Sequence, residues 1–407
     1  MTRITLIRHG ETTANVAQLL QGRNDAPLTA QGEAQLAKAA GRIADDALYD
    51  LVVSSPQGRA LASSAALGFG DPETDADLVE GDPGTWEGLT RSEILAGFPD
   101  DVARLAAGED IAIGGGERRS DLRRRAIGAL ERIAARVGPE GRALVVTHGG
   151  VIGAAAAGVL QVDGGRWPLA RVLNTSFTTV EMGPDPRLLA FNDDSHLHED
   201  DRDGYRADRA THIVLMRHGQ TEANAAGVWQ GRLPGVLDAV GLAQAQDLTG
   251  FVPQLDALYA SPLQRAIDTA GPLAVERGLE IEIHEDLAEM AMGQWEGLTT
   301  AEIQDRDPAI WTALYEKGED VARGSDGETF GGVAARMRRA IDEIAAANQG
   351  RTIGIVSHGA ALRAFLGTVL GFGFPGRNVI PSMENTAVSR LVISKRGSAL
   401  ATFNVRP

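Results

Sequence analysis

Two histidine motifs occur twice in this chain of 407 residues, in the same order and at a nearly constant separation. An Arg-His-Gly triplet at residues 8–10 returns at 217–219, and a Thr-His-Gly triplet at 147–149 returns as Ser-His-Gly at 357–359. The first pair of triplets is 209 residues apart and the second pair 210. Imidazole and guanidinium groups that recur in this way are side chains that could bind an anion and attack it.

Arginine and carboxylate motifs recur between the histidine motifs. Ser-Pro-x-x-Arg-Ala occurs at 55–60 and 261–266, and Trp-Glu-Gly-Leu-Thr occurs at 86–90 and 295–299. Hydrolysis of a phosphate monoester needs a nucleophile in line with phosphorus, positive donors for the phosphoryl oxygens and an acid for the leaving oxygen. A neutral imidazole is a competent nucleophile, and a guanidinium matches phosphate geometry. Each half of the chain contains two histidines, two arginines and a carboxylate that would suffice for this reaction.

These motifs, together with Glu-Thr-x-x-Asn at 11–15 and its counterpart at 220–224, resemble the histidine phosphatase superfamily, in its phosphoglycerate-mutase-like branch. The resemblance covers nearly the whole chain twice and omits only the segment between the copies. It implies a phosphoric monoester hydrolase that acts through a phosphohistidine intermediate, without a metal or an organic cofactor.

The resemblance also assigns roles to individual residues of each copy. His9 and His218 would be the nucleophiles, and Glu80 and Glu289 would be the general acids. The groups that would surround the phosphoryl oxygens are two arginines, an asparagine and the late histidine of each copy: Arg8, Asn15, Arg59 and His148, then Arg217, Asn224, Arg265 and His358. Two further carboxylates, those of Glu87 and Glu296, lie close to the assigned acids in the sequence.

The elements that must position these residues alternate between strand and helix. Short apolar runs predict strands buried on both faces, and longer amphipathic stretches predict helices. The predicted strands are 4–7, 51–53, 143–146, 213–216 and 353–356, and the predicted helices are 34–43, 122–137 and 333–347. The pattern favours two tandem three-layer α/β/α domains, each with a mostly parallel central sheet. Ligands of such sheets bind beyond the carboxyl ends of the strands, where the histidine triplets fall.

Composition narrows the classes of protein further. Lys plus Arg is 39 and Asp plus Glu is 55, so the formal net charge of −16 disfavours general binding to nucleic acid or to anionic membranes. Cysteine is absent, which excludes disulfides, thiolate nucleophiles and cysteine-ligated metals. The longest apolar run, 149–160, is too short to span a bilayer. We expect a soluble, cytoplasmic protein whose partner is a small phosphate ester, and we interpret the arginine-rich stretch over 118–125 as a solvated helix face.

The near-constant offset over half the chain predicts two homologous domains, at 1–192 and 211–407. The segment 193–210 between them holds seven acidic residues and three arginines, so we interpret it as a solvated acidic linker. His196 and His198 lie among these acids, and a polar tether is favoured over a metal site there. Relatives of this superfamily often pair as dimers, which suggests by analogy that the two domains pack as an internal pseudo-dimer.

The two copies differ outside the catalytic motifs. The first copy has Leu20, Gly-Asp-Pro at 81–83 and Gly153, where the second has Trp229, Met-Ala-Met at 290–292 and Arg363; Leu28-Thr29 is likewise replaced by Leu237-Asp238. No catalytic group is lost. The differences therefore predict two active sites with differently shaped leaving-group pockets and different preferred esters.

Three alternatives stay open. A cofactor-dependent phosphoglycerate mutase uses the same phosphohistidine but carries a longer segment between the acid and the late histidine. Here Glu80 precedes His148 by 68 residues and Glu289 precedes His358 by 69, which favours the compact phosphatase form. One copy could instead be a regulatory or binding domain, although neither has lost a catalytic group. A phosphatase that acts on phosphohistidine in proteins fits the same motifs.

Overall fold

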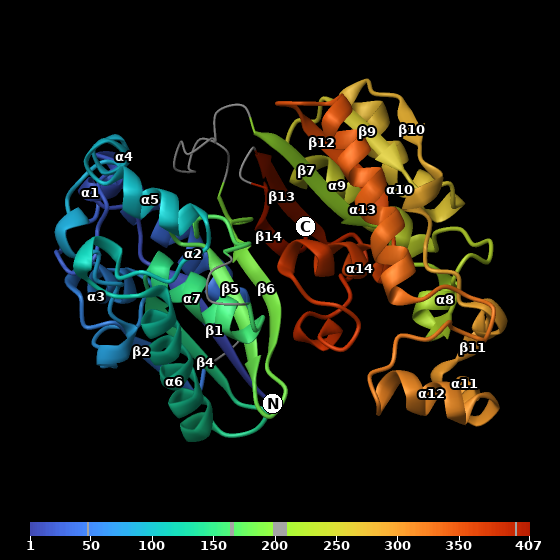
Figure 1. The fold of residues 1–407 in the computed structure, drawn as a ribbon, viewed down its shortest axis with the longest axis horizontal. Helices are drawn as coiled ribbons and strands as arrows, with labels where there is room; N and C mark the ends of the chain where they lie inside the picture. The colour runs from blue at the N-terminus through green and yellow to red at the C-terminus, as the bar shows by residue number, and fades with distance from the viewer. Residues whose placement is uncertain (47–48, 163–166, 198–209, 395–396) are drawn as a thin grey trace. The chain divides into compact units, whose positions relative to one another are not determined.

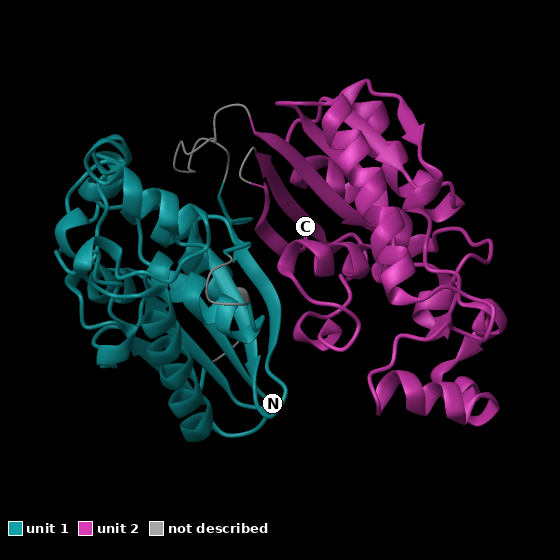
Figure 2. Cartoon of the chain, in the orientation of Figure 1, with its two compact units in different colours: residues 1–206 teal, residues 207–407 magenta. Residues whose placement is uncertain are grey.

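The computed structural model describes residues 1–46, 49–162, 167–197, 210–394 and 397–407. The chain divides into two compact units, Met1–Arg206 (unit 1) and Ala207–Pro407 (unit 2), which Figure 2 colours separately. No helix in these described ranges combines the length and the apolar character that crossing a membrane requires.

Each unit is built around one sheet with helices on both of its faces (Figure 1). The described strands of unit 1 are β1 (Thr2–Arg8), β2 (Leu51–Ser54), β3 (Glu73–Thr74), β4 (Arg142–Thr147), β5 (Phe177–Met182) and β6 (Arg187–Asp193). Their order in the sheet is β6-β5-β1-β4-β2-β3, in which β1, β4, β2 and β3 are parallel and β5 and β6 are antiparallel. The strands predicted in the first half of the sequence are confirmed as β1, β2 and β4.

The described helices of unit 1 are α1 (Thr13–Val16), α2 (Ala30–Asp46), α3 (Gly58–Ala66), α4 (Arg91–Gly97), α5 (Pro99–Ala106), α6 (Arg119–Val137) and α7 (Gly149–Val159). Helices α2 and α3 cover one face of the sheet, where Leu36 and Ala60 pack with Ile7, Leu144 and Val146. Helices α6 and α7 pack against each other; both contact β1, and α6 also contacts β4. The predicted three-layer α/β/α arrangement is confirmed for this unit.

Unit 2 repeats this architecture. Its described strands are β7 (Thr211–Arg217), β8 (Val228–Trp229), β9 (Ala257–Ala260), β10 (Ile281–Ile283), β11 (Leu298–Thr299), β12 (Thr352–Ser357), β13 (Val388–Ser394) and β14 (Gly397–Val405). The sheet order is β10-β9-β12-β7-β13-β14, again with four parallel strands and an antiparallel pair, and β8 pairs with β11 separately.

The helices of unit 2 complete the same three layers. They are α8 (Glu222–Ala225), α9 (Ala239–Phe251), α10 (Gln264–Arg277), α11 (Thr300–Arg306), α12 (Pro308–Tyr315), α13 (Phe330–Ala347) and α14 (Gly359–Leu370). Helices α9 and α10 pack on one face of the sheet, where Leu248 and Ala270 meet Met216 and Val356. Helices α13 and α14 pack against each other, and α14 also contacts β7 and β14.

The segment 193–210 was predicted to be a solvated acidic linker. This prediction is wrong for its first residues, which belong to the folded part of unit 1. Asp193 and Asp194 are buried, and Asp193 ends strand β6. The guanidinium of Arg42, from α2, donates to the Asp193 carboxylate, and a buried carboxylate is stabilised by such a partner. The ring of His196 packs against the ring of Phe177, with centroids 5.3 Å apart. The rest of the predicted linker, 198–209, lies outside the described residues.

Glycine in the Arg-His-Gly triplet is required by a close approach of two backbone segments. A Cβ built on Gly10 would lie 2.8 Å from the carbonyl oxygen of Gly32, and one on Gly219 would lie 2.5 Å from that of Gly241. Gly32 and Gly241 lie in the first turns of α2 and α9. The triplet therefore anchors the histidine loop of each unit against the helix that follows it.

Candidate active site

His9 and His218 lie directly after β1 and β7, at the carboxyl ends of these central strands. Each imidazole is 3% exposed. Its Nδ1 lies 2.8 Å from the carbonyl oxygen of Gly10 in unit 1, and 2.7 Å from that of Gly219 in unit 2. Because a carbonyl oxygen only accepts hydrogen bonds, Nδ1 carries the proton and Nε2 keeps its lone pair. Each unit thus holds one imidazole in the tautomer that a nucleophile requires.

His148 and His358 are the N-cap residues of α7 and α14, and both are fully buried. The ring centroids of the two imidazoles in each unit are 5.3 Å apart in unit 1 and 5.0 Å apart in unit 2. The Nε2 of the late histidine lies 2.8 Å from Ser55 Oγ, or 2.7 Å from Ser261 Oγ. If the serine hydroxyl donates to Nε2, the proton of the imidazole is on Nδ1, which is buried and has no hydrogen-bond partner among the described residues.

Two buried arginines accompany these histidines in each unit. Arg8 and Arg217 each donate through Nη1 to a backbone carbonyl oxygen, at 2.8 and 2.7 Å. Arg59 and Arg265, at the start of α3 and α10, donate through both Nη atoms to carbonyl oxygens of the loop that follows α1 or α8. The Nε atoms of Arg59, Arg217 and Arg265 are buried and have no hydrogen-bond partner in the described part of the chain.

These surroundings hold the pKa of all four imidazoles well below the usual value for histidine. Burial is the largest cause in each case, because it disfavours the charged form. For His9 and His218 the positive charges of the two arginines of the same unit are the next causes. All four imidazoles are therefore neutral at pH 7, which leaves Nε2 of His9 and of His218 available to attack an electrophile.

The carboxylates of Glu80 and Glu289 lie at the N-termini of α7 and α14, beside the late histidines. Glu80 Oε2 accepts a hydrogen bond from the backbone N–H of Gly150 at 2.8 Å, and Glu289 Oε1 accepts one from that of Ala361 at 2.9 Å. Burial lowers the pKa of Arg59 and of Arg265, and the charge of the nearby Glu80 or Glu289 partly opposes this shift. The predicted acid, histidines and arginines of each copy are thus brought to one place.

A further arginine holds each of these carboxylic residues and was not predicted from the sequence. Arg125 donates to the backbone carbonyl of Glu80 at 3.2 Å, and Arg336 donates to that of Glu289 at 3.0 Å. Each guanidinium also pairs with a neighbouring carboxylate, at 2.7 and 2.8 Å. The interpretation of 118–125 as a solvated helix face is therefore wrong for Arg125, whose side chain is 15% exposed.

Glu87 and Glu296 occupy a different place from Glu80 and Glu289. Glu87 accepts hydrogen bonds from three consecutive backbone N–H groups of the loop after α1, and Glu296 accepts one from the corresponding loop after α8. These are the loops whose carbonyl oxygens receive the guanidinium groups of the second arginines. The Trp-Glu-Gly-Leu-Thr motif therefore supports the site through a loop.

Asn15 and Asn224 are held by a second asparagine that sequence reasoning missed. Asn174 Nδ2 donates to Asn15 Oδ1 at 3.1 Å and to the carbonyl oxygen of His9 at 2.9 Å. Asn385 makes the same two contacts in unit 2, at 3.1 and 2.9 Å. The next residue in both units is a threonine with φ of +56° or +55°, an unusual conformation for a β-branched side chain. The Asn-Thr pair recurs 211 residues apart, which is the signal that could have found it.

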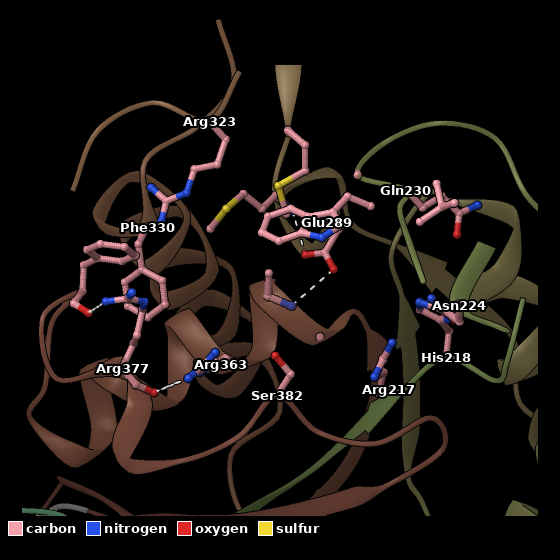
Figure 3. A pocket seen from close by; sticks show the side chains of 18 of the residues that line it. Arg217, His218, Asn224, Gln230, Glu289, Arg323, Phe330, Arg363, Arg377 and Ser382 are labelled. Atoms are coloured by element: carbon pink, nitrogen blue, oxygen red, sulfur yellow. Dashed lines mark hydrogen bonds between the residues drawn. The ribbon is translucent and has the colours of Figure 1, made fainter. Parts of the chain in front are cut away.

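Unit 2 has a cavity of about 410 Å³ beside His218 (Figure 3). Four of the residues by which the copies differ line it: Trp229, Met290, Met292 and Arg363. The cavity walls also include aromatic residues from α12, α13 and the segment after α14. Sequence differences between the copies therefore fall on the walls of this cavity.

The chain belongs to the histidine phosphatase superfamily (branch 1), whose family model matches residues 4–194 and 213–406. The two matched segments correspond to the two copies of the motifs. The family resemblance that the motifs predicted is confirmed.

Characterised relatives are similar to parts of the chain. A protein of Mycobacterium tuberculosis described as bifunctional is 36% identical over 166 residues, which are 40% of this chain and 45% of that protein. A metal-independent phosphoserine phosphatase of Arabidopsis thaliana is 36% identical over 161 residues, which are 38% of this chain and 66% of that protein. A glucosyl-3-phosphoglycerate phosphatase of Mycobacterium tuberculosis is 34% identical over 193 residues, which are 45% of this chain and 86% of that protein. The chain thus spans less than half the length of the first of these relatives.

Solved structures also resemble one part of the chain. A mycobacterial hydrolase is 28% identical and covers 49% of this chain and 100% of its own, with a TM-score of 0.46.

Proposed function

We propose that this chain is a phosphatase that hydrolyses small phosphorylated metabolites, with one active site in each unit and a phosphohistidine intermediate in each. The nucleophiles are His9 and His218, and the general acids are Glu80 and Glu289. The relatives named as a phosphoserine phosphatase and a glucosyl-3-phosphoglycerate phosphatase support this class of substrate.

The observation that carries the proposal is a set of buried nitrogen atoms that have no hydrogen-bond partner among the described residues. In unit 2 these are Nε of Arg217, Nε of Arg265 and Nδ1 of His358. Buried donors are nearly always satisfied in folded proteins, so a group of them beside one oriented imidazole is expected to have a ligand partner. A phosphoryl group supplies several negatively charged oxygen acceptors at once, and no single neutral group does.

The proposed reaction has two steps, phosphorylation of the histidine and hydrolysis of the phosphohistidine. In the first, the lone pair of Nε2 on His9 or His218 attacks phosphorus, and the bond from phosphorus to the ester oxygen breaks. The leaving oxygen takes the proton of the protonated Glu80 or Glu289. In the second, the same carboxylate accepts a proton from water, the water oxygen bonds to phosphorus, and the N–P bond breaks to release inorganic phosphate. The arginines and the late histidine hold the phosphoryl oxygens throughout.

Phosphate release from single and double variants tests the proposal. Inorganic phosphate is measured for the parent chain, His9→Ala, His218→Ala and the double variant, over a panel of sugar phosphates, phosphoglycerates and phosphoserine. Each single variant is expected to lose one part of the panel by at least about 10³-fold in kcat, and the double variant to lose all of it.

The same panel separates the alternatives. If one single variant keeps the full parent activity on every ester, the unit that it changes is a binding or regulatory domain. If phosphoglycerates interconvert without release of phosphate, the chain is a mutase. Either result contradicts the proposal.

A further inference from the structure

Charge is strongly unbalanced along the cavity of unit 2. Of the described residues that line it, five are arginines and one, Glu289, is acidic. Arg217 and Arg265 belong to the phosphate site. The other three, Arg323, Arg363 and Arg377, have no part in the chemistry described above.

These three arginines lie at the opposite end of the cavity from His218. Figure 3 shows Arg323, Arg363 and Arg377 around one end, His218 and Arg217 at the other, and Glu289 between them. An ester whose phosphoryl group reached His218 would therefore direct its leaving group toward the three guanidinium groups.

Two of the three are buried, which is costly for a cation unless something compensates its charge. Arg323 is 3% exposed and pairs with Asp320 at 2.7 Å. Arg377 is 7% exposed, and its hydrogen bonds run to the neutral carbonyl oxygens of Phe374 and Leu314, at 2.8 and 3.3 Å. Burial lowers the pKa of Arg377, as expected for a cation with incomplete compensation.

Aromatic rings pack against the faces of two of the guanidinium groups, so a ligand would reach these groups through N–H groups in the guanidinium plane. Arg377 lies 3.7 Å from the ring centroid of Phe374 and 5.1 Å from that of Tyr315, and Arg323 lies 4.6 Å from that of Phe374. Stacking uses the face of the guanidinium plane, whereas its N–H groups point outward in that plane. Arg363, on α14, is anchored by the carbonyl oxygen of Arg377 at 3.0 Å.

Unit 1 lacks two of these three arginines at the matching positions. Asp110 and Asp320 each lie four residues before a glycine with positive φ. When these glycines are aligned, Ile113 of unit 1 falls at the position of Arg323 in unit 2. Gly153 takes the place of Arg363, and a Cβ on Gly153 would lie only 3.0 Å from the ring of Trp167. The space that the Arg363 side chain uses in unit 2 is therefore closed by Trp167 in unit 1.

We infer that Arg323, Arg363 and Arg377 form a second anion site, so that unit 2 prefers phosphomonoesters whose leaving group carries a further carboxylate or phosphate, whereas unit 1 does not. The inference rests on the proposed phosphatase function and deepens it. A carboxylate and a phosphate are both acceptors that arginine binds in its plane, so the cavity accommodates the shared chemistry of the two.

Three esters that differ in one group test the inference in the His9→Ala chain, where unit 2 alone turns over. Glycerol 3-phosphate carries no second anion, 3-phosphoglycerate carries a carboxylate, and 2,3-bisphosphoglycerate carries a carboxylate and a second phosphate. The kcat/KM for at least one of the latter two is expected to exceed that for glycerol 3-phosphate by 10-fold or more. Which of them gains identifies the anion.

Variants within the second anion site must reduce the ratio of kcat/KM for the preferred ester to kcat/KM for glycerol 3-phosphate. Arg363→Ala and Arg377→Met are each expected to lower it at least fivefold, mainly through KM, and Arg363→Lys is expected to restore part of it. Arg339→Ala is the matched control, because Arg339 is exposed and pairs with Asp286 outside the cavity. Equal kcat/KM for all three esters, or a ratio that survives both variants, overturns the inference.

Binding to a chain without nucleophiles separates this inference from the proposed function. In the His9→Ala/His218→Ala double variant, calorimetry measures the affinity for 3-phosphoglycerate, 2,3-bisphosphoglycerate and glycerol 3-phosphate without any turnover. If 3-phosphoglycerate or 2,3-bisphosphoglycerate binds more tightly than glycerol 3-phosphate and Arg377→Met removes this difference, the second anion site is supported even if phosphate release fails. Equal binding of all three esters contradicts the site, even if phosphate is released normally.

Discussion

The proposed active sites of units 1 and 2 have the same frame of histidines, arginines and glutamates and different walls. Corresponding contacts of the two histidines agree within 0.1 Å, at 2.8 and 2.7 Å for Nδ1 and again at 2.8 and 2.7 Å for the late Nε2. By contrast, Trp167 in unit 1 lies where the side chain of Arg363 begins in the cavity of unit 2. In the proposed sites, reaction chemistry and leaving-group recognition are thus assigned to separate sets of residues.

The frame is constant because backbone groups hold most of it. The nucleophilic histidines, the arginines and the general acids are each fixed by a carbonyl oxygen or an N–H group of a strand end, a loop or a helix start. A change in the side chains of a neighbouring loop leaves these groups where they are. The walls consist mainly of side chains, so single substitutions alter them.

Replacement of the proposed general acid is expected to have the largest effect on kcat, and it tests whether the two units share the same catalytic residues. Glu80→Gln, made in the His218→Ala chain, and Glu289→Gln, made in the His9→Ala chain, are each expected to lower kcat by about 10²–10⁴-fold on alkyl phosphates, because a glutamine cannot protonate the leaving oxygen. With p-nitrophenyl phosphate, whose leaving group needs no proton, the first step should be nearly unaffected, so a burst of p-nitrophenol should precede a slow second step that still needs the carboxylate as a base. Glu73→Gln, at an exposed carboxylate that pairs with Arg136, is the control for unit 1. A first-step rate that falls as much with p-nitrophenyl phosphate as with alkyl phosphates breaks the assignment of these acids.

A smaller but equally symmetrical effect is expected at the asparagines that hold the nucleophile loops. Asn174→Ala and Asn385→Ala remove the hydrogen bonds to Asn15 and Asn224 and to the carbonyl oxygens of His9 and His218. Each is expected to lower kcat by about 10²-fold in its own unit, as a misplaced nucleophile would. Steady-state rates in the two single-nucleophile backgrounds measure this. An effect in one unit alone would show that the two frames are not equivalent.

The buried imidazoles predict how stability changes with pH in both units. Because the pKa of each is lowered in the folded chain, the unfolded chain binds more protons, and the free energy of unfolding falls as pH decreases below about 6.5. Each imidazole contributes up to about 1.4 kcal/mol per pH unit. His148→Gln and His358→Gln should each flatten the pH dependence of the urea midpoint between pH 7 and 5.5. The control is His284→Gln, outside the site, and a slope that none of the three changes contradicts the prediction.

The smallest effect concerns a carboxylate that only unit 1 has at this position. Asp25 pairs with Arg59 at 3.0 Å, and the corresponding residue of unit 2 is Pro234. The Asp25 side chain is 47% exposed, so solvent weakens the pair. Asp25→Asn should tighten competitive inhibition of unit 1 by inorganic phosphate by about two- to fivefold, measured in the His218→Ala chain. Pro234→Asp should weaken inhibition of unit 2 by inorganic phosphate. If neither variant changes the inhibition, Asp25 does not account for a difference between the units.

The fold and the frame of the site were predictable because the chain carries two copies of each. Repetition indicated the strand ends at Arg8 and Arg217 and the late histidines as candidate site residues, and buried parallel strands bring such ends to one edge of a sheet. Arg125 and Asn174 also have counterparts in unit 2, Arg336 and Asn385. Their contribution was not predicted, because they donate hydrogen bonds to backbone carbonyl oxygens. A sequence does not show which carbonyl a side chain reaches.

The burial of the first linker residues and the lining of the cavity could not be predicted, because both depend on contacts between segments that are far apart in the sequence. Asp193 is buried because Arg42, 151 residues earlier, pairs with its carboxylate. Arg323 and Arg377 share a cavity because α12, α13 and the segment after α14 meet there. Composition and periodicity describe neighbours along the chain, and these contacts are not among them.

Trapping the intermediate shows directly whether both units form a phosphohistidine. The parent chain, His9→Ala and His218→Ala are mixed with substrate, quenched in base within milliseconds, digested and sequenced by mass spectrometry. A phosphoryl group is expected on His9 and His218 of the parent, on His218 alone in His9→Ala, and on His9 alone in His218→Ala. Phosphate release without any phosphorylated histidine, or label on the same residue in all three chains, would contradict the account.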